Sequence, residues 1–471
     1  MSETGYHHLR EIGREFGVEI HRPGAHQLHF MVQSPAQLFG LCSRLRAENC
    51  YLVSVIANDE RELEDDCFKI YYFFSHPVDN VFVAVEYNLP PGREIYPSIH
   101  AIYPSVETFE REIADLLGLL PEQKEPRVFP QAYLHGCYPV ELSPLRRDRS
   151  QEVFERLLRS GIPGGGPLPG DVAAMRDFFL GELIVPVGPI HAGVIEPGNF
   201  NFRISGEVIE GLDLRLGYTH KGIERLYQRK YDLCAGWKLA EQVAGDSSFA
   251  HNVAYSKAIE VMVGVALLPE AHLLRALFLE IERVTNHIGS CAGLVQDLAL
   301  DVPAAEMMVL REEMMQLCGR LTGSRFLQGI NQPGGLRLPA PLDTEHIRST
   351  VREVTRRFLS LAQMLAERPD FRQRTIQVGV LPRDTALLLG VTGLAARASG
   401  IARDFRIQHP FGPYELPEVR ALLVDPRVES LNVPWDMAGD VFSRFVQRVL
   451  EVEVAQRLIE VFLDRWPGEK Q

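Results

Sequence analysis

The segment at residues 188–198, Gly-Pro-Ile-His-Ala-Gly-Val-Ile-Glu-Pro-Gly, places one histidine and one carboxylate among turn-forming residues. Glycine and proline favour turns, so we expect His191 and Glu196 to lie on a shaped loop. A titratable pair of this kind can transfer protons near neutral pH. A structural turn that carries a solvated glutamate is the alternative, and the spacing alone does not decide between them.

The segment at residues 241–251, Glu-Gln-Val-Ala-Gly-Asp-Ser-Ser-Phe-Ala-His, contains a break in a helical pattern. One glycine and two serines interrupt the helix there. Because the break carries Glu241, Asp246 and His251, it has the character of a functional site. A plain helix N-cap at Asp246 or Ser247 is the simpler alternative.

A third group of titratable residues is Glu280, Arg283 and His287, in the segment Leu-Phe-Leu-Glu-Ile-Glu-Arg-Val-Thr-Asn-His. The spacing i, i+3 and i+7 places all three on one face of a helix. The surrounding helix is apolar on most sides, which favours buried ion pairs there, and an ordinary solvated face is the alternative. Buried charge of this kind often marks a functional network.

Two further segments are candidate binding loops. Residues 216–226, Leu-Gly-Tyr-Thr-His-Lys-Gly-Ile-Glu-Arg-Leu, contain His220 beside a threonine that could cap a helix, and capping alone explains much of this pattern. Residues 331–337, Asn-Gln-Pro-Gly-Gly-Leu-Arg, predict a tight turn that ends at Arg337, with an ordinary interhelical connection as the alternative. The sequence contains no phosphate-binding glycine-rich loop, HExxH or GxSxG, so spacing alone defines no catalytic class.

The elements that must position these residues predict an α+β protein with two domains. Strands are expected at residues 27–32, 49–57, 68–74 and 80–87, and helices at 8–16, 35–48 and 106–117. Further along, strands are expected only within 183–214, followed by helices at 234–265, 270–300, 304–323, 346–367 and 440–464. We therefore predict a small α+β domain at residues 1–157, a Gly/Pro linker at 158–172, and a mainly α-helical domain with a short N-terminal sheet at 173–471.

The composition limits the classes of function. An apolar content of 46% is ample for two cores, and a net charge of −13 argues against nucleic acid as a partner. The first residues do not form a signal peptide, and no apolar stretch reaches the roughly 20 residues that span a bilayer. We therefore expect a cytoplasmic chain that meets the membrane only through partners. Its seven cysteines stand singly, without a CxxC pair, which favours reduced thiols.

Taken in order, the segments resemble the D-type subunit of respiratory complex I and, more closely, the large subunit of group 4 membrane-bound nickel-iron hydrogenases such as formate hydrogenlyase. The resemblance runs from Gly181 nearly to the end, through residues 188–198, 218–226, 280–289, 331–337 and the Gly-Asp-Val-Phe at 439–442. The first domain resembles the C-type subunit of complex I at residues 109–118 and 144–146. The fused C-plus-D order is typical of formate hydrogenlyase-like large subunits.

The resemblance implies where a metal centre would lie. In such hydrogenases two CxxC pairs bind nickel and iron through four thiolates. The first pair would fall at Ala244 and Ser247, and the second in a tail after the last helix, where this sequence reads Trp-Pro-Gly-Glu-Lys-Gln. We therefore expect no metal bound by the chain's own cysteines. A hydrogenase with Asp, Ser and His ligands is the least favoured alternative, because hard oxygen ligands disfavour such a centre.

In complex I the corresponding cavity holds a quinone head group beside a histidine and a tyrosine. Aligning His251 with the family's Tyr-Leu-His motif places Phe249 at the tyrosine position, and phenylalanine has no hydroxyl to donate. Ordinary quinone reduction is therefore disfavoured, although the polar residues 246–248 could suit a quinone, another acceptor or a proton relay. The resemblance assigns the cavity and its proton path to His191, Glu196, Glu241, Asp246, His251, Glu280, Arg283 and His287. It assigns cofactor or acceptor binding to His220, Phe249 and Arg337.

The function that the resemblance implies is that of a peripheral-arm subunit, on the inner face of the cell membrane, in an NADH-quinone oxidoreductase-like or formate hydrogenlyase-like complex. Electrons would arrive from iron-sulfur clusters in a small partner subunit, and membrane-arm subunits would complete the assembly. A non-catalytic scaffold that keeps the same interfaces is the alternative.

Overall fold

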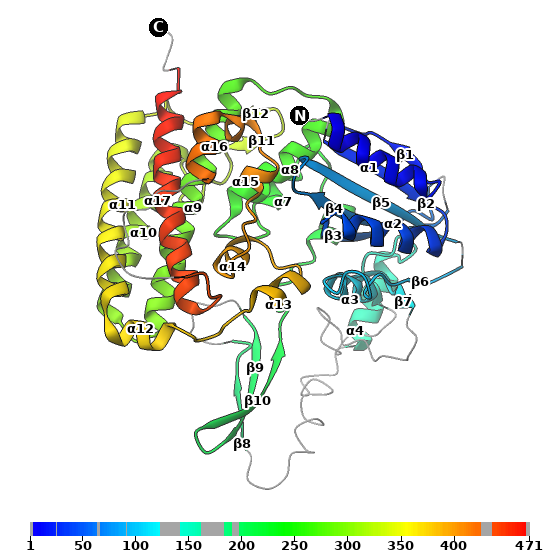
Figure 1. The fold of residues 1–471 in the computed structure, drawn as a ribbon, viewed down its shortest axis with the longest axis horizontal. Coiled ribbons are helices and arrows are strands. Elements are labelled where there is room, and N and C mark those ends of the chain that lie inside the picture. Colours follow the sequence, from blue (N-terminus) through cyan, green and yellow to red (C-terminus); the bar gives the residue numbers. More distant parts are fainter. Residues whose placement is uncertain are drawn as a thin grey trace. The chain divides into compact units, whose positions relative to one another are not determined.

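The computed structural model describes residues 3–24, 26–63, 66–90, 92–122, 142–161, 183–190, 197–424 and 436–467. The chain divides into two compact units, Met1–Gln228 with Leu388–Gly390, and Arg229–Leu387 with Val391–Gln471. The first unit contains the larger sheets and the second the long helices, so the predicted α+β fold class is confirmed (Figure 1). The linker predicted at 158–172 lies mostly outside the described residues, and the domain boundary that it marks stays a prediction.

A five-stranded sheet in the order β1-β2-β5-β4-β3 organises the first unit. Its strands are β1 (Glu19–His21), β2 (Gln27–Val32), β3 (Tyr51–Asp59), β4 (Phe68–His76) and β5 (Val81–Leu89). Alternate residues such as Phe30, Tyr72 and Val85 are fully buried on one face, which is the period expected of a sheet with one covered side. The helices α1 (Glu3–Glu15), α2 (Pro35–Ala47) and α3 (Val106–Leu117) share a core with this face.

The strands and helices predicted for this half of the chain are confirmed, with shifted ends. Sequence patterns did not reveal β1, the short parallel pair β6 (Ile95–Pro97) and β7 (Leu120–Glu122), or helix α4 (Gln151–Gly161). Three-residue strands are too short to show a period, and their pairing depends on distant partners.

A three-stranded antiparallel sheet, in the order β10-β9-β8, also belongs to the first unit. It contains β8 (Leu183–Val187), β9 (Asn199–Ser205) and β10 (Val208–Arg215), within the region predicted to hold strands. Residues paired across neighbouring strands point to the same side of a sheet. The register therefore gathers nine apolar side chains, called here the apolar face: Leu183, Val185, Val187, Phe200, Phe202, Ile204, Ile209, Leu212 and Leu214. Its outer members are exposed, from 36% for Val185 to 61% for Leu183.

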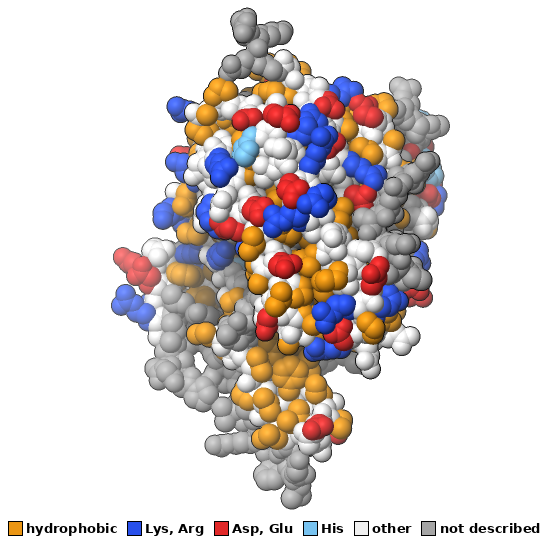
Figure 2. Space-filling model, turned by 90° about the vertical axis from the view of Figure 1, so that its left-hand side faces the viewer, with side chains coloured by type: hydrophobic (Ala, Val, Ile, Leu, Met, Phe, Trp, Pro, Cys, Tyr) orange, Lys and Arg blue, Asp and Glu red, His pale blue; other side chains and the backbone are white. Residues whose placement is uncertain are grey.

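Four long helices form the core of the second unit: α9 (Pro269–Asp297), α10 (Asp301–Thr322), α11 (Thr344–Glu367) and α17 (Val441–Asp464). Both α9 and α11 pack against α10 and α17, so the four helices enclose one apolar core, as Figure 1 shows. The outer side of the bundle carries ion pairs such as Arg357 with Glu313 at 2.8 Å. Figure 2 shows acidic and basic side chains interspersed over this side, which is the character of a solvated surface.

The helix predicted at 234–265 is divided in two, α7 (Trp237–Ala240) and α8 (Ser248–Val263), and the predicted interruption lies between them. The predicted turn at 331–337 contains a small hairpin of β11 (Asn331–Gln332) and β12 (Gly335–Leu336). The shorter helices are α6 (Ile223–Arg229), α12 (Pro369–Thr375), α13 (Arg383–Leu388), α14 (Gly393–Ala398), α15 (Phe405–Gln408), η2 (Gly412–Glu415) and α16 (Pro417–Val424). No helix among the described residues has the length and apolar character needed to cross a membrane.

The start of α17 is held by the Gly-Asp pair of the Gly-Asp-Val-Phe segment. The Asp440 carboxylate accepts hydrogen bonds from the backbone N–H groups of Ser443 at 2.7 Å and Gln377 at 2.8 Å. Gly439 has a φ of +77°, and a Cβ at this position would lie 2.1 Å from the carbonyl oxygen of Leu381. Only glycine fits there, because both the backbone conformation and the close approach exclude a side chain.

We expect Gly439→Ala to destabilise the protein by about 3 kcal/mol or more, since left-handed strain of roughly 1–2 kcal/mol is added to a clash with backbone. Gly264→Ala is the matched control, because Gly264 has a φ of +71° and open space around the added Cβ. The control should cost only about 1 kcal/mol. Urea unfolding followed by circular dichroism measures both variants, and equal midpoints would contradict the steric explanation.

Candidate functional site

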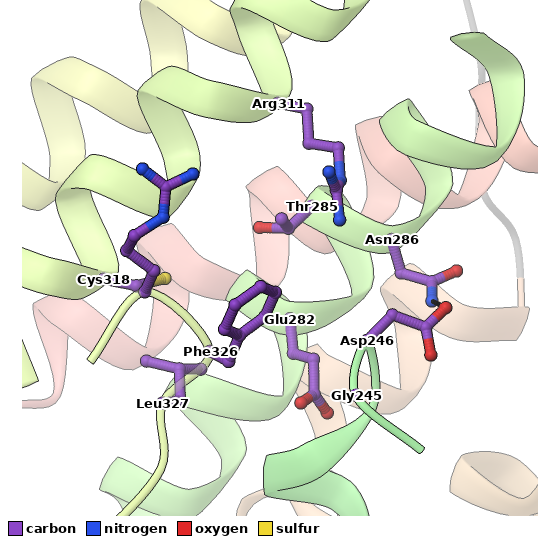
Figure 3. Close-up of a pocket in the computed structure, with 10 residues that line it drawn as sticks. Gly245, Asp246, Glu282, Thr285, Asn286, Arg311, Cys318, Phe326 and Leu327 are labelled. Atoms are coloured by element: carbon purple, nitrogen blue, oxygen red, sulfur yellow. Dashed lines mark hydrogen bonds between the residues drawn. The ribbon is translucent and has the colours of Figure 1, made fainter. Parts of the chain in front are cut away.

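The loop between α7 and α8 forms one wall of a recess. The recess is open to solvent and comprises about 350 Å³ of space, part of which is that open solvent. Helices α9 and α10 supply most of its other walls (Figure 3). It is lined by Gly245, Asp246, Glu282, Thr285, Asn286, Arg311, Cys318, Arg325, Phe326 and Leu327. Residues 244–248, called here the cavity loop, contain the two positions at which the resemblance places metal-binding thiolates.

Glu241, at the end of α7, is buried beside the cavity loop with 5% of its surface exposed. Its Oε1 accepts hydrogen bonds from Asn252 Nδ2 at 2.7 Å and from the backbone N–H of Gly329 at 2.9 Å. Burial raises the pKa of Glu241 by more than these two hydrogen bonds lower it. The group is therefore a buried carboxyl that can hold a proton at a higher pH than an ordinary glutamate.

Glu241 is the first member of a buried network that fixes the β11–β12 hairpin against α8 and α9. Asn331 Nδ2 donates to Asn252 Oδ1 at 2.8 Å, and Arg275 Nε donates to Asn331 Oδ1 at 2.8 Å. Arg275 also forms a double hydrogen bond with Glu260, at 2.7 and 2.8 Å. Because these polar groups satisfy one another, the network can remain in an apolar setting and give the hairpin one position.

Glu280 and Arg283 belong to a second buried network, on the face of α9 that the spacing predicted. Glu280 is fully buried and accepts hydrogen bonds from Arg283 Nε at 3.0 Å, Arg406 Nη1 at 3.1 Å and the hydroxyl of Tyr414 at 2.7 Å. Burial alone favours the neutral acid, but Arg283, Arg406 and Tyr414 outweigh it and lower the pKa of Glu280. The predicted buried ion pairing is therefore confirmed, and Glu280 is a carboxylate.

His287, at the far end of this face, pairs with α17. Its Nε2 lies 2.8 Å from Glu451 Oε2, and Glu451 also accepts from Arg397 Nε at 2.7 Å. Burial lowers the pKa of His287 despite this hydrogen bond, so we assign a neutral ring that donates Nε2–H to the carboxylate. Although burial opposes it, the hydrogen bond to His287 and the nearby arginines hold the pKa of Glu451 well below its usual range.

The other candidates in the second unit lie apart from these networks. Asp246, in the cavity loop, accepts a hydrogen bond from Asn286 Nδ2 at 2.9 Å, and His251 lies half-buried in the first turn of α8. Phe249 is fully buried, with its ring 5.6 Å from that of Phe278. Its side chain therefore contributes to the apolar core. Arg337 is exposed just after the hairpin.

Three candidates fall outside the second unit or outside the described residues. His191 and Glu196 lie in the stretch 191–196, which the structure does not describe. His220 belongs to the first unit, where its Nε2 lies 4.0 Å from Glu224 Oε2. Arg283 Nη1 lies 3.9 Å from Glu451 Oε2, which joins Glu280 and Arg283 to His287 in one network. Glu241 belongs to another network, and the residues named for the two networks do not overlap.

Sequence reasoning missed several partners in these networks. Arg406, Tyr414 and Glu451 are distant from α9 in sequence, so no spacing rule could join them to Glu280 and His287. Glu282 was passed over because it lies off the helix face that carries the other charges. The sequence does contain a signal for Glu282, because Glu280, Glu282 and Arg283 place three charges within four positions of one apolar helix.

The groups at the cavity loop do not fit a thiolate-bound nickel-iron centre. Ala244 has no ligand atom, and Ser247 offers only a hydroxyl, which is a poor ligand for such a centre. Cys318 is the thiol that lines the recess, and burial raises its pKa to about 12, so it stays protonated. No group of three or more His, Cys, Asp or Glu residues in the described part of the chain could hold a metal ion. That the thiolates are replaced here stays a prediction.

Comparison with known protein families identifies the class to which this fold and site belong. Residues 31–153 match the family model described as the 30 Kd subunit of respiratory-chain NADH dehydrogenase. Residues 297–471 match the one described as its 49 Kd subunit. The chain is therefore an oxidoreductase subunit in which these two types of domain are fused.

Individual relatives narrow this class. Formate hydrogenlyase subunit 5 of Escherichia coli is 30% identical over 427 residues, which cover 89% of this chain and 70% of that protein. Hydrogenase-4 component G of the same organism is 28% identical over 88% of this chain and 69% of its own length. NADH-quinone oxidoreductase subunit 4 of Thermus thermophilus is 28% identical over 64% of this chain and 70% of its own length. The chain belongs to the family of large subunits shared by complex I and the membrane-bound hydrogenases.

We expect Arg406→Met to destabilise the protein by about 3–5 kcal/mol, because it leaves the carboxylate of Glu280 buried without one of its cations. The double variant Arg406→Met with Glu280→Gln should recover part of this loss, since the unpaired charge is then absent. Arg356→Met, which breaks an exposed pair with Glu353, should leave the unfolding midpoint unchanged. Thermal and urea unfolding measure these differences, and a silent Arg406→Met would refute the role given to this pair.

Proposed function

We propose that this chain forms the acceptor cavity of a complex I-like membrane oxidoreductase, as a peripheral-arm subunit on the inner face of the membrane. Electrons arrive from iron-sulfur clusters in a small partner subunit, and a quinone or another acceptor takes them up at the cavity loop. Family membership supports the general role, since the relatives are subunits of hydrogenases and NADH-quinone oxidoreductases.

The observation that carries the proposal is the pair of carboxyl groups, Glu241 and Glu282, that adjoin the cavity loop. Glu241 precedes the loop and is bound to Asn252 on α8, and Glu282 binds the first turn of α8 from α9. Burial raises the pKa of both groups. Reduction of an acceptor consumes protons, and a carboxyl group whose pKa is raised by burial holds its proton to a higher pH than usual and can supply it.

The roles proposed for the chain's own residues follow from this geometry. Glu241 holds a proton beside the loop, while Asn252 and the Gly329 amide fix the direction of its carboxyl group. The network of Glu280, Arg283 and His287 keeps α9 in register with α17 and α15, so the walls of the cavity stay in place. His191 and Glu196 remain candidates for the outer part of the proton path.

We assign the apolar face of the β8–β10 sheet to contact with a membrane-arm subunit. The nine side chains of this face include no charged or polar residue, and Figure 2 shows hydrophobic side chains gathered on this sheet. Exposed apolar faces of this kind mark sites of interaction with a partner protein or a membrane. One relative is described as a membrane-bound hydrogenase subunit alpha, which supports a partner of this kind.

We expect Glu241→Gln to lower electron transfer by the assembled complex by roughly 100-fold, the scale of a lost general acid. Both hydrogen bonds of Glu241 go to Oε1, so a glutamine can keep them while it loses the titratable proton. Glu353→Gln, on the exposed side of α11, is the matched control and should keep full activity. Full activity of an assembled Glu241→Gln complex would remove Glu241 from the site and favour the non-catalytic scaffold.

Leu212→Glu should reduce the amount of membrane-arm subunit that co-purifies with the chain by about tenfold or more, because it places a charge in an apolar contact. Leu212 is 48% exposed, so the chain itself should still fold. Ile184→Glu is the control on the opposite side of the same sheet, where its register partner is Arg203. Equal recovery of partner with the two variants would show that the apolar face is not this contact.

A further inference from the structure

Glu282 lies in the wall of the recess, and the spacing of the sequence motifs did not single it out. In Figure 3 its side chain reaches from α9 toward the cavity loop at Gly245. Glu282 is on the opposite side of α9 from the face that carries Glu280, Arg283 and His287. Its hydrogen bonds therefore go to other partners than those of the buried network on that face, to Phe249 and Ala250.

Both carboxyl oxygens of Glu282 contact the first turn of α8. Oε1 accepts the backbone N–H of Phe249 at 2.8 Å, and Oε2 accepts that of Ala250 at 3.0 Å. The first N–H groups of a helix lack partners within the helix, and Ser247, the N-cap residue, forms no capping hydrogen bond with its side chain. Glu282 therefore caps the N-terminus of α8 from α9, in place of the Ser247 side chain. This contact fixes the end of the cavity loop.

Burial of the Glu282 carboxyl group favours the neutral acid. Burial raises its pKa to about 7, even though the hydrogen bonds from Phe249 and Ala250 lower it. Asp246, in the cavity loop, raises the pKa further by repulsion, and Arg283, on α9, lowers it. The contacts from α8 are the two backbone amides.

Helix α10 and the loop that follows it complete the surroundings of this carboxyl group. Arg311 is on α10, and its side chain lines the recess. The side chain passes close to Gly289 of α9, because a Cβ added at Gly289 would lie 2.8 Å from Arg311 Cδ. Arg325 is paired with Glu312, and the thiol of Cys318 stays protonated because burial raises its pKa to about 12. The recess thus joins the Glu282 carboxyl group to solvent beside that of Asp246, and Arg325 is engaged by Glu312.

We propose that Glu282 is a proton-exchanging positioning residue, whose carboxyl group links proton uptake in the recess to the position of the cavity loop. Protonation forms one O–H bond with a proton from solvent and involves no electron transfer. In the closed state the neutral carboxyl group is buried against the first turn of α8. Burial makes a charged carboxylate unfavourable there, so loss of the proton favours an open state in which water reaches the group. The relevance to acceptor chemistry rests on the proposed function, whereas the proton exchange itself does not.

Hydrogen exchange of the peptide that contains residues 249 and 250, measured on the full chain at several pH values, tests the proposal. The pKa of Glu282 is about 7 in the closed state, against an ordinary value of 4.5. Protonation therefore favours the closed state at low pH, and this preference is lost as the pH rises from 4.5 toward 7. After correction for intrinsic rates, the opening of this peptide should therefore increase by at least about tenfold across that range. The first turn of α11, capped by its own Asp343, is the internal control and should show no such change.

Two variants separate the titration of Glu282 from other causes. Glu282→Gln should remove the pH dependence, and Asp246→Asn should move its midpoint to lower pH, because a repelling charge is absent. A flat profile in the unmodified chain, or an unmoved midpoint in Asp246→Asn, would overturn the proposal even if Glu282→Gln did not fold. The measurement needs no enzymatic activity, so its failure is distinguishable from failure of the proposed function.

Discussion

The second unit depends on how α9 neutralises the charges that it carries into an apolar core. An isolated charge in such a core is strongly unfavourable, so each one requires a partner of opposite charge or several hydrogen bonds. Arg275 is satisfied by Glu260 and Asn331, and Glu280 by Arg406 and Tyr414. These requirements determine where the neighbouring elements can lie.

The result is a helix whose two ends fix different parts of the molecule. The N-terminal half of α9 holds α8 and the hairpin through Arg275, and its C-terminal half holds α17 through His287 and Glu451. Between them, Glu282 reaches the cavity loop. A polar loop can therefore remain next to an apolar bundle because its position is determined by side chains from a rigid helix rather than by the loop itself.

Local patterns in the sequence predicted the long elements well. Strands at residues 27–32 and helices at 270–300 and 440–464 have strong periods, and they are present in the structure. The break before α8 was also predicted, because glycine and serine disfavour a helix interior. The partners of Glu280 and His287 were not predictable, since Arg406, Tyr414 and Glu451 meet them only through tertiary packing. Phe249 shows the same limit, because alignment gave its position but not the direction of its ring.

The β8–β10 sheet affects how copies of the free chain interact with one another. It presents an apolar face between two outer strands, β8 and β10, and sheets with exposed apolar edges readily pair with other chains. A copy of the chain in which this face is uncovered therefore carries a surface that favours self-association, and the proposed contact with a membrane-arm subunit would remove it.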